Sequence, residues 1–183
     1  MAFYTPDPAM GETLAHLVNQ LASQGRPGLA DEISITWLRY SQSLLDRAAS
    51  LSGAAFEALP VAGAGWGGER QRYPASVVKL VYLVAAEAWL KRQWLGSTDE
   101  LQRALADMVR ESSNDATGYV MDLLSGTTSG VELPAEAFAE WSHQRQGVNR
   151  WLMALGWPEL EGSNASQKTW GDGPYGRERQ SYG

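Results

Sequence analysis

The sequence predicts an α+β fold that is mostly helical, with one or two antiparallel strands in its first half. Apolar residues recur at helical spacing in several segments, and they alternate with polar residues over one short segment between residues 33 and 40. A chain of 183 residues with 44% hydrophobic content can bury one sizeable core but is too short for two ordinary domains. We therefore expect a single domain over residues 1–183.

The first half of the chain begins with a helix. Asp7-Pro8 marks its start, apolar residues follow at helical spacing from Met10 to Leu21, and Gly25-Arg-Pro-Gly28 ends it. Isoleucine and tryptophan then alternate with serine and threonine, which predicts a strand that runs to about Tyr40. Residues 41–60 are ambiguous between a loop and a short helix. The glycines of 63–68 predict a flexible segment, and a second strand is expected near 66–72.

The second half is helical up to residue 156. A helix is expected from Pro74 to about residue 94, and a second one after an N-cap at residues 97–98, followed by first-turn acids. Four short polar residues at 112–115 predict a junction before the helix resumes at residues 116–124. Another helix follows Pro134 and ends at Gly156, with Gly147 able to bend or divide it. Residues 157–183 lack periodicity and are expected to form a long loop or a tail.

Composition excludes several classes of function. The net charge of -6 and the pI of about 4.9 argue against a nucleic-acid partner. The chain has no cysteine, and its two histidines, His16 and His143, are far apart in sequence, so we expect no metal site and no cofactor. No signal peptide and no membrane-spanning run is visible. We expect a soluble protein, cytoplasmic if Met1 is the native start and periplasmic or secreted if a leader has been removed.

The most informative segment is Tyr73-Pro-Ala-Ser-Val-Val-Lys79, at the start of an apolar helix. Ser76 and Lys79 are three residues apart, so they share one face of that helix. Apolar surroundings lower the pKa of a lysine, which allows it to accept a proton. Free N–H groups in a first helical turn can stabilise an oxyanion. The pair therefore suggests a serine nucleophile with a lysine base.

The spacing alone is weak support for this interpretation. With 16 serines and three lysines, random placement gives about 0.26 Ser-x-x-Lys pairs in a chain of this length. The alternative is a small residue and a surface lysine on an ordinary buried helix. The position of the pair at the opening of an apolar helix favours the catalytic interpretation.

A second motif strengthens the catalytic interpretation of Ser76 and Lys79. Ser76-x-x-Lys79 followed by Ser112-Ser113-Asn114 resembles the first two motifs of the active-site serine penicillin-recognising enzymes, which include class A β-lactamases and D-Ala-D-Ala peptidases. In that family the first motif opens a central helix and the second lies between two helices. Both motifs are expected in those places here. The resemblance covers nearly all of this chain but about two-thirds of the family's domain.

The resemblance implies a role for each matching residue. Ser76 would be the acylated nucleophile and Lys79 the base that activates it. Ser112 would pass a proton to the leaving nitrogen, and Asn114 would bind the substrate amide while it contacts Lys79. The implied substrate is a small-molecule amide or ester, such as a β-lactam or a peptide-like compound.

The sequence also departs from the family pattern at specific residues. Lys168-Thr169-Trp170-Gly171 lies in a turn-rich stretch and does not match the family's third motif, and no C-terminal strands follow it. Glu159, Glu161 and Glu178 do not have the spacing of the family's deacylating glutamate. We therefore expect an incomplete domain, with residues 157–183 as an omega-like loop or tail. A second polypeptide or a chain-swapped copy would complete it.

Three functions follow in order of support. The first is a serine hydrolase of the β-lactamase and penicillin-binding type that acts through an acyl-enzyme. The second is an esterase or peptidase of the same fold with little activity on β-lactams. The third is an inert fragment that serves as a binding or structural module.

Overall fold

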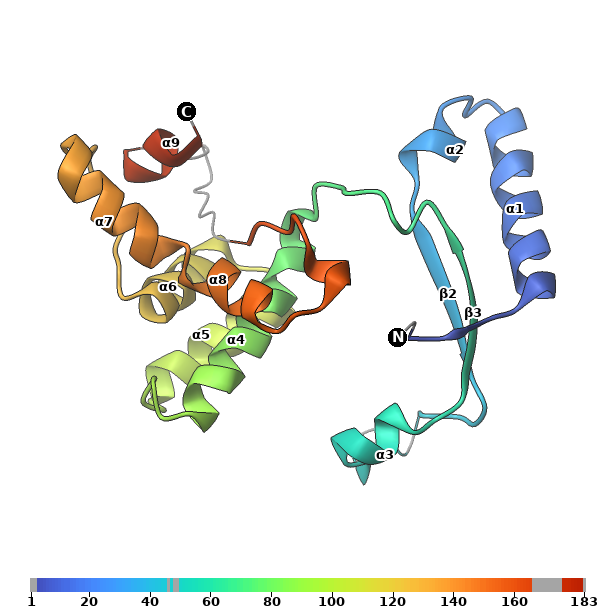
Figure 1. Ribbon diagram of the computed structural model, residues 1–183, viewed down its shortest axis with the longest axis horizontal. Coiled ribbons are helices and arrows are strands. Elements are labelled where there is room, and N and C mark those ends of the chain that lie inside the picture. The colour runs from blue at the N-terminus through green and yellow to red at the C-terminus, as the bar shows by residue number, and fades with distance from the viewer. Residues whose placement is uncertain (1–2, 46, 48–49, 166–175, 183) are drawn as a thin grey trace. The chain divides into compact units, whose positions relative to one another are not determined.

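A computed structural model describes residues 3–45, 47, 50–165 and 176–182 of the chain. The fold is α+β, with a small mixed sheet and a larger set of helices. Contacts between residues divide the chain into two compact units, residues 1–72 and residues 73–183 (Figure 1). Each unit is described by itself below.

The first unit is built on a three-stranded sheet. Its strands are β1 (Thr5–Pro6), β2 (Ile35–Tyr40) and β3 (Val61–Trp66), in the order β1-β3-β2. β2 and β3 are antiparallel, with Ile35 opposite Trp66 and Tyr40 opposite Val61, whereas the short β1 is parallel to β3. Among the described residues, β2 therefore has a neighbour on one side only.

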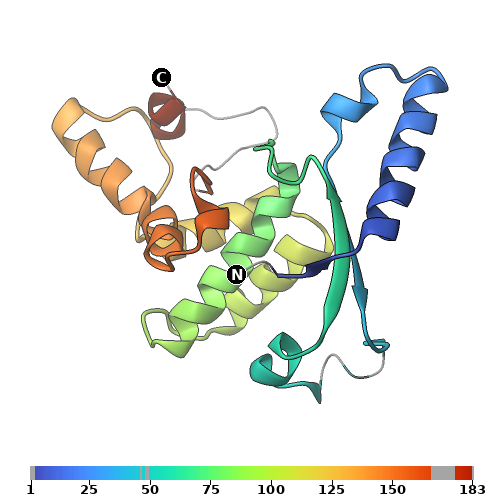
Figure 2. The same cartoon turned by 45° about the vertical axis from the view of Figure 1, so that its right-hand side comes forward.

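Helix α1 (Pro8–Ser23) packs on the sheet along β3, as Figures 1 and 2 show. The Asp7 carboxylate caps α1 by accepting hydrogen bonds from the backbone N–H groups of Ala9 and Met10, and Pro8 occupies the first turn. Met10, Leu14 and Val18 are buried, four residues apart, against Ala64 of β3. Leu17 and Leu21, which the sequence places on the same apolar face, stay 47% and 43% exposed.

The second strand lies earlier in the chain than the sequence predicts. The prediction of a strand at residues 66–72 is wrong except for Trp66, because β3 spans Val61–Trp66. β3 includes residues 63–66 of the glycine-rich segment 63–68, which was expected to be flexible. The glycines serve close packing instead. A Cβ on Gly63 would lie 2.8 Å from the Trp37 carbonyl oxygen and 2.8 Å from Cδ2 of Tyr4. The strand therefore needs small residues where the Tyr4 ring crosses it.

Two short helices complete the first unit. Helix α2 (Leu29–Glu32) precedes β2, and α3 (Gly53–Glu57) lies between β2 and β3. The Ser52 hydroxyl caps α3 by accepting a hydrogen bond from the Ala55 N–H. The residue before the helix thus determines where it begins, and Gly53 is its first residue.

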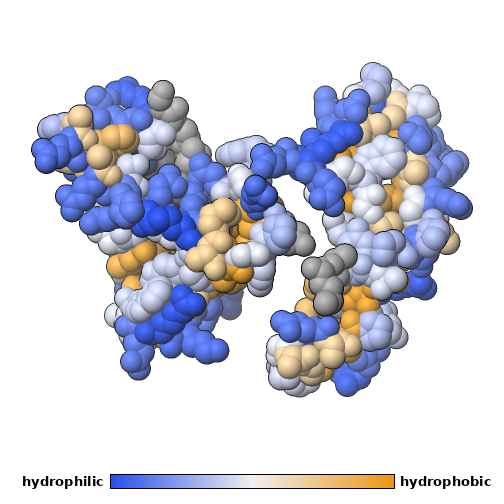
Figure 3. Space-filling view, viewed as in Figure 1, coloured by the Kyte–Doolittle hydropathy of each residue, from blue (hydrophilic) through white to orange (hydrophobic). Residues whose placement is uncertain are grey.

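The second unit is an assembly of helices around α4. A 3₁₀ turn, η2 (Ala75–Val78), leads into α4 (Lys79–Lys91), which is followed by α5 (Asp99–Arg110) and α6 (Asn114–Ser125). Tyr82, Ala85 and Ala86 of α4 are almost completely buried against α5 and α6. Other side chains of η2 and α4 reach the surface, with Val77 of η2 and Leu80 and Val84 of α4 more than half exposed. Figure 3 shows apolar residues on the visible face of this unit.

Helices α7 (Ala135–Arg145) and α8 (Gly147–Ala154) follow, and Gly147 divides them as predicted. The stretch after residue 157, expected as loop or tail, contains a 3₁₀ turn, η3 (Pro158–Leu160), and a short helix, α9 (Arg177–Tyr182). The remaining predicted helices are confirmed, including Thr98 as the N-cap of α5. No helix in the described part of the chain is long and apolar enough to cross a membrane.

A buried ion-pair cluster holds α9 in place. The Arg145 guanidinium, 3% exposed, lies 2.7 Å from the Asp122 carboxylate and 3.4 Å from that of Glu178. The side chain of Gln180 forms two hydrogen bonds with the backbone of Leu133, at 2.8 and 2.9 Å. Since a buried charge is stable only when it is paired, this cluster explains how a six-residue helix stays docked on α6 and α7.

Candidate functional site

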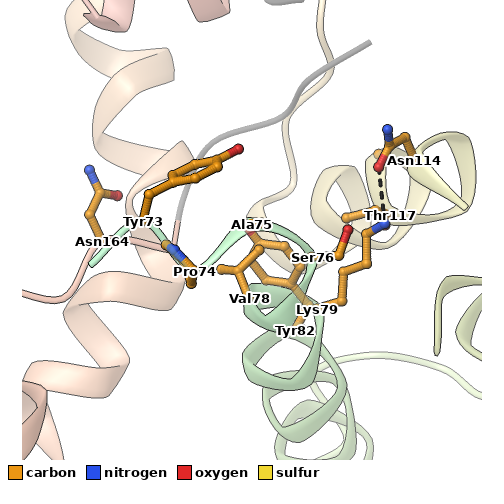
Figure 4. Close-up of a pocket in the computed structure, with 11 residues that line it drawn as sticks. Tyr73, Pro74, Ala75, Ser76, Val78, Lys79, Tyr82, Asn114, Thr117 and Asn164 are labelled. Atoms are coloured by element: carbon orange, nitrogen blue, oxygen red, sulfur yellow. Dashed lines mark hydrogen bonds between the residues drawn. The ribbon is translucent and has the colours of Figure 1, made fainter. Parts of the chain in front are cut away.

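Ser76 and Lys79 lie in one turn at the start of α4. Ser76 is in the 3₁₀ turn η2, and Lys79 is the first residue of the α-helix, so the α-helix begins five residues after Pro74, where the sequence predicts it. The three-residue spacing matches the three residues per turn of a 3₁₀ helix, which places the two side chains one above the other. Figure 4 shows them on the same side of this turn.

The junction between α5 and α6 supplies the other half of the site. The Lys79 Nζ donates hydrogen bonds to the Ser112 carbonyl oxygen at 2.5 Å, the Ser112 Oγ at 2.9 Å and the Asn114 Oδ1 at 3.0 Å. These three acceptors come from one turn of the chain, 33 to 35 residues from the lysine in sequence. The structure therefore brings together all four predicted residues. The Ser76 hydroxyl forms no hydrogen bond with another described residue.

Local hydrogen bonds fix the shape of this junction. Ser113 caps α6 by accepting a hydrogen bond from the Ala116 N–H, and the Thr117 hydroxyl donates one to the Ser113 carbonyl oxygen at 2.6 Å. Ser112 has a left-handed backbone with a φ of +54°. That conformation directs both its carbonyl and its hydroxyl oxygen to the same amine, and a non-glycine residue adopts it only where its surroundings compensate for the strain.

A second strained residue precedes the serine. Ala75 has a φ of +47°, which is unfavourable for an alanine because of its Cβ. One left-handed residue, Ala75, thus precedes Ser76, and another, Ser112, supplies two of the three acceptors of Lys79. Such strain concentrates at functional sites, because a folded chain retains it only where the surrounding contacts determine the conformation.

Lys79 is a buried amine without a carboxylate partner. It is 5% exposed, and within the described ranges it forms no ion pair. Burial lowers the pKa of Lys79 from its ordinary value of 10.5, because the charged form loses its hydration. Its acceptors are neutral oxygens, which stabilise the charged form less than a carboxylate would. The Lys79 amine therefore loses its proton at a lower pH than the amine of a surface lysine does.

A pocket of about 210 Å³ lies over the pair. One wall is the start of α4, with Tyr73, Pro74, Val78 and Tyr82 around Ser76 and Lys79. Asn114, Thr117 and Gly118 of α6 form another part of the lining, and Asn164 completes it. In Figure 4, Tyr73 and Asn164 lie toward one end of this group, and Asn114 and the Lys79 amine lie toward the other. The pocket thus has a polar end at the lysine and a mixed aromatic and amide end.

Several lining residues were not selected from the sequence, although spacing could have indicated them. Tyr82 lies three residues after Lys79, and Thr117 lies three after Asn114, so each continues a helix face that already carries a predicted residue. Asn164 has no such signal. It reaches the pocket because Asn149 of α8 donates a hydrogen bond to its Oδ1 at 2.9 Å, a tertiary contact across 15 residues.

The remaining candidates lie elsewhere. Glu178 is buried in the ion pair with Arg145, and neither it nor Glu161 lines the pocket. Lys168–Gly171, the stretch compared with a third motif, lies outside the described residues. Within the described ranges, no group of three or more histidine or acidic side chains could hold a metal ion.

The tryptophans, interpreted as core and groove-lining residues, divide between interior and surface. Trp89 and Trp141 are buried, whereas Trp94 and Trp157 are about 60% exposed, and none of the described tryptophans lines the pocket.

A scan against protein-family models gives no match, and searches of curated proteins and of solved structures give no significant match. The support for a function therefore comes from the residues and their geometry.

Proposed function

We propose that this chain is a serine hydrolase of the β-lactamase and penicillin-binding type, which forms an acyl-enzyme with an amide or ester on Ser76. The observation that carries the proposal is the convergence of the Ser112 and Asn114 oxygens on the buried amine of Lys79, three residues from Ser76. Two sequence motifs separated by more than 30 residues meet at one side chain. A surface lysine on an ordinary helix would have no reason to be buried by that junction.

The proposed reaction has two steps. The Ser76 Oγ attacks the carbonyl carbon of the substrate and gives its proton to the neutral amine of Lys79. The bond from the carbonyl carbon to the leaving nitrogen or oxygen then breaks, and a proton passes from Lys79 through the Ser112 hydroxyl to the leaving group. Water hydrolyses the resulting ester, releases the carboxylic acid and restores the Ser76 hydroxyl.

The hydrogen bonds of Lys79 suit this cycle. An ammonium has three N–H groups, and three acceptors surround it. When the amine is neutral it retains two donors and gains a lone pair. The Ser112 hydroxyl is the one partner that can change from acceptor to donor, so it can follow the lysine through both protonation states. Asn114, on the polar side of the pocket, is placed to bind the substrate amide.

We propose slow deacylation. Among the described residues, no carboxylate lines the pocket, so no second general base, separate from Lys79, stands beside Ser76 for the hydrolytic water. The acyl-enzyme would therefore accumulate, as in a penicillin-binding protein rather than in a fast β-lactamase. An esterase or peptidase with the same nucleophile and little β-lactam activity uses the same acylation step.

A second candidate function is binding without turnover. It is favoured by one observation, that the Ser76 hydroxyl has no hydrogen-bond partner among the described residues while the donors of Lys79 are directed to Ser112 and Asn114. A lysine that stays charged and fully bonded would hold a ligand in the pocket but would not activate the serine.

We further propose that the fold is the β-lactamase and D-Ala-D-Ala peptidase-like fold in incomplete form, and that a second polypeptide or a chain-swapped copy completes it. β2 stands at one end of the strand order, and Trp37 on it is 40% exposed. An unpaired edge with an exposed aromatic residue favours pairing with another strand. A chain that sediments as a monomer and is fully active alone would overturn this part of the proposal.

One set of assays separates the alternatives. The protein is incubated with a chromogenic cephalosporin, a fluorescent penicillin and a short-chain ester, and turnover and covalent labelling are followed. Turnover of the cephalosporin indicates a β-lactamase, and labelling without turnover indicates a penicillin-binding protein. Reaction with the ester alone indicates an esterase, and no reaction with any of the three supports the binding function. Activity that survives Ser76→Ala would exclude the proposed mechanism.

A further inference from the structure

We infer that the pocket has a dedicated subsite for a planar acyl group, in which Tyr73 is the stacking residue and Asn149 is a positioning residue for the wall at Asn164. The inference rests on the proposed function for the orientation of the substrate, since the acylated carbonyl must reach Ser76. It goes further by naming the chemical class of the acyl group, an aryl or similarly flat group.

Tyr73 is an exposed aromatic side chain at a fixed place. Its side chain is 85% exposed, although it lines the pocket, so its ring is accessible to a ligand. Pro74 follows it and restricts the backbone of Tyr73 to extended conformations. A large exposed ring on a restricted backbone loses little conformational entropy when a flat group stacks on it.

Asn149 holds the part of the pocket lining at Asn164 through two hydrogen bonds. The Asn149 carboxamide accepts a hydrogen bond from the Ala165 N–H at 2.7 Å and donates one to the Asn164 Oδ1 at 2.9 Å. It also donates one to the Gln146 Oε1 at 2.6 Å, which fixes its orientation on α8. Ala165 is 4% exposed and belongs to the core, so the segment is anchored by packing on one side and by Asn149 on the other.

The two features lie at the same end of the pocket. In the view of Figure 4, Tyr73 and Asn164 both lie on the side of the group away from the Lys79 amine and Asn114. When the carbonyl carbon of the substrate lies at Ser76 and its amide nitrogen lies near Asn114, the rest of its acyl group extends toward Tyr73 and Asn164. Tyr73 offers it an aromatic face, and Asn164 forms part of the pocket lining there.

Binding in the Ser76→Ala variant tests the subsite independently of catalysis. The probes are N-benzoylglycinamide and N-acetylglycinamide, which differ only in the aryl group, and their dissociation constants are measured by ligand-observed NMR titration. The benzoyl compound should bind about three- to tenfold more tightly, the range that aromatic stacking supplies. Equal affinities, or no binding of either probe, would overturn the inference.

Second-site variants in the same background separate stacking from a general structural effect. Tyr73→Phe should keep the preference for the benzoyl probe, and Tyr73→Ala should reduce it to less than twofold. Tyr119→Ala is the matched control, because Tyr119 is also exposed but does not line the pocket. A preference that persists in Tyr73→Ala, or that falls equally in Tyr119→Ala, contradicts the role of Tyr73.

A double-mutant cycle tests Asn149. If Asn149 acts through Asn164, then Asn149→Leu and Asn164→Ala each weaken binding of the benzoyl probe, and the double variant is no weaker than the worse single one. Additive losses would show that Asn149 does not act through Asn164. Labelling of wild-type Ser76 by p-nitrophenyl acetate is measured separately, so a failure of the acyl-enzyme proposal and a failure of the subsite give different results.

Discussion

Lys79 is a basic side chain placed where a cation is unfavourable. It is almost completely buried and surrounded by neutral oxygens, with no carboxylate among its described partners. Desolvation lowers the pKa of its amine, while the three hydrogen bonds keep the amine in one position. A fixed position and a lowered pKa are what an amine needs to serve as the base that activates a serine.

The first prediction concerns pH. The neutral amine of Lys79 is the form that accepts the Ser76 proton, so the rate of Ser76 acylation rises with pH as the amine deprotonates. Because burial lowers the pKa of Lys79, the plateau should be reached below the ordinary lysine value of 10.5. The rate is measured from p-nitrophenol release at high enzyme concentration.

Two variants control this measurement. Lys79→Met should abolish the reaction, and Lys91→Met, at the exposed end of the same helix, should leave the profile unchanged. A rate in the wild-type protein that is independent of pH from 6 to 10 would exclude Lys79 as the base.

The second prediction concerns a variant that should shift the pH profile of Ser76 acylation. Asn114→Asp places a carboxylate where an amide oxygen now lies 3.0 Å from the Lys79 Nζ. A negative charge at that distance favours the ammonium and raises the pKa of Lys79, so the midpoint of the acylation profile should move to higher pH by about one unit. Asn114→Leu, which removes the acceptor without adding charge, should lower the rate without this alkaline shift. A midpoint that moves to lower pH in Asn114→Asp would contradict the proposed contact.

Sequence spacing was sufficient for the four motif residues but not for the rest of the pocket. Ser76 and Lys79 share one turn, and the polar run at 112–115 is a helix junction, as predicted from residue types alone. Asn164 could not be predicted, because its place depends on the tertiary contact with Asn149. The left-handed backbone of Ser112 also has no signal in the sequence, since serine rarely adopts it.

At the scale of elements, the junction between α5 and α6 is the part that builds the site. Ser113 caps α6 and lies between Ser112 and Asn114, the two residues that bond to Lys79. The stability of the helix start and the geometry of the acceptors therefore depend on the same turn.

This gives the third prediction. Ser113→Ala removes the N-cap of α6, and Thr98→Ala removes that of α5. Each should lower the free energy of unfolding by about 1 kcal/mol. Only Ser113→Ala should also slow the acylation of Ser76, because it loosens the acceptors of Lys79. Stability is measured by urea denaturation and acylation by p-nitrophenol release. Equal slowing in both variants would indicate a general effect of stability.

The fourth prediction compares two glycines of the first unit. Gly63→Ala should destabilise the sheet by about 1–3 kcal/mol, because the new Cβ would lie 2.8 Å from both the Trp37 carbonyl oxygen and the Tyr4 ring. Gly11→Ala should stabilise α1 by up to about 1 kcal/mol, since a Cβ there meets nothing within 4 Å. Urea midpoints followed by tryptophan fluorescence give both values. A neutral Gly63→Ala would mean that the close packing of β3 is not required.

The elements differ in how far the sequence could predict them. α1, α5, α6, α7 and α8 have apolar periodicity with an N-cap or a stop signal, and their places agree with the prediction. β3 was misplaced because its glycines are typical of loops, and only the packing of Tyr4 and Trp37 against it explains them. β1 and α2 are too short for any periodicity to appear.

At the scale of the whole molecule, the site belongs to one unit. All described residues that line the pocket lie in the range 73–164. The turn η2, which carries Ser76, leads directly into α4, whose buried residues belong to the core of that unit. The core of the second unit therefore fixes the start of α4 against the junction at Ser112. The α+β class was predictable because it depends on periodicity, whereas the division into two compact units depends on contacts that no local pattern contains.

The most direct test of the central claim is mass spectrometry of the protein after reaction with a fluorescent penicillin and with p-nitrophenyl acetate. Trypsin cleaves after Arg72 and Lys79, and the peptide 73–79 contains a single serine, Ser76. The acyl-enzyme proposal predicts an adduct of the acyl mass on this peptide with at least one of the two reagents, and its loss in Ser76→Ala. No adduct with either reagent, or an adduct on another peptide that survives Ser76→Ala, would contradict it.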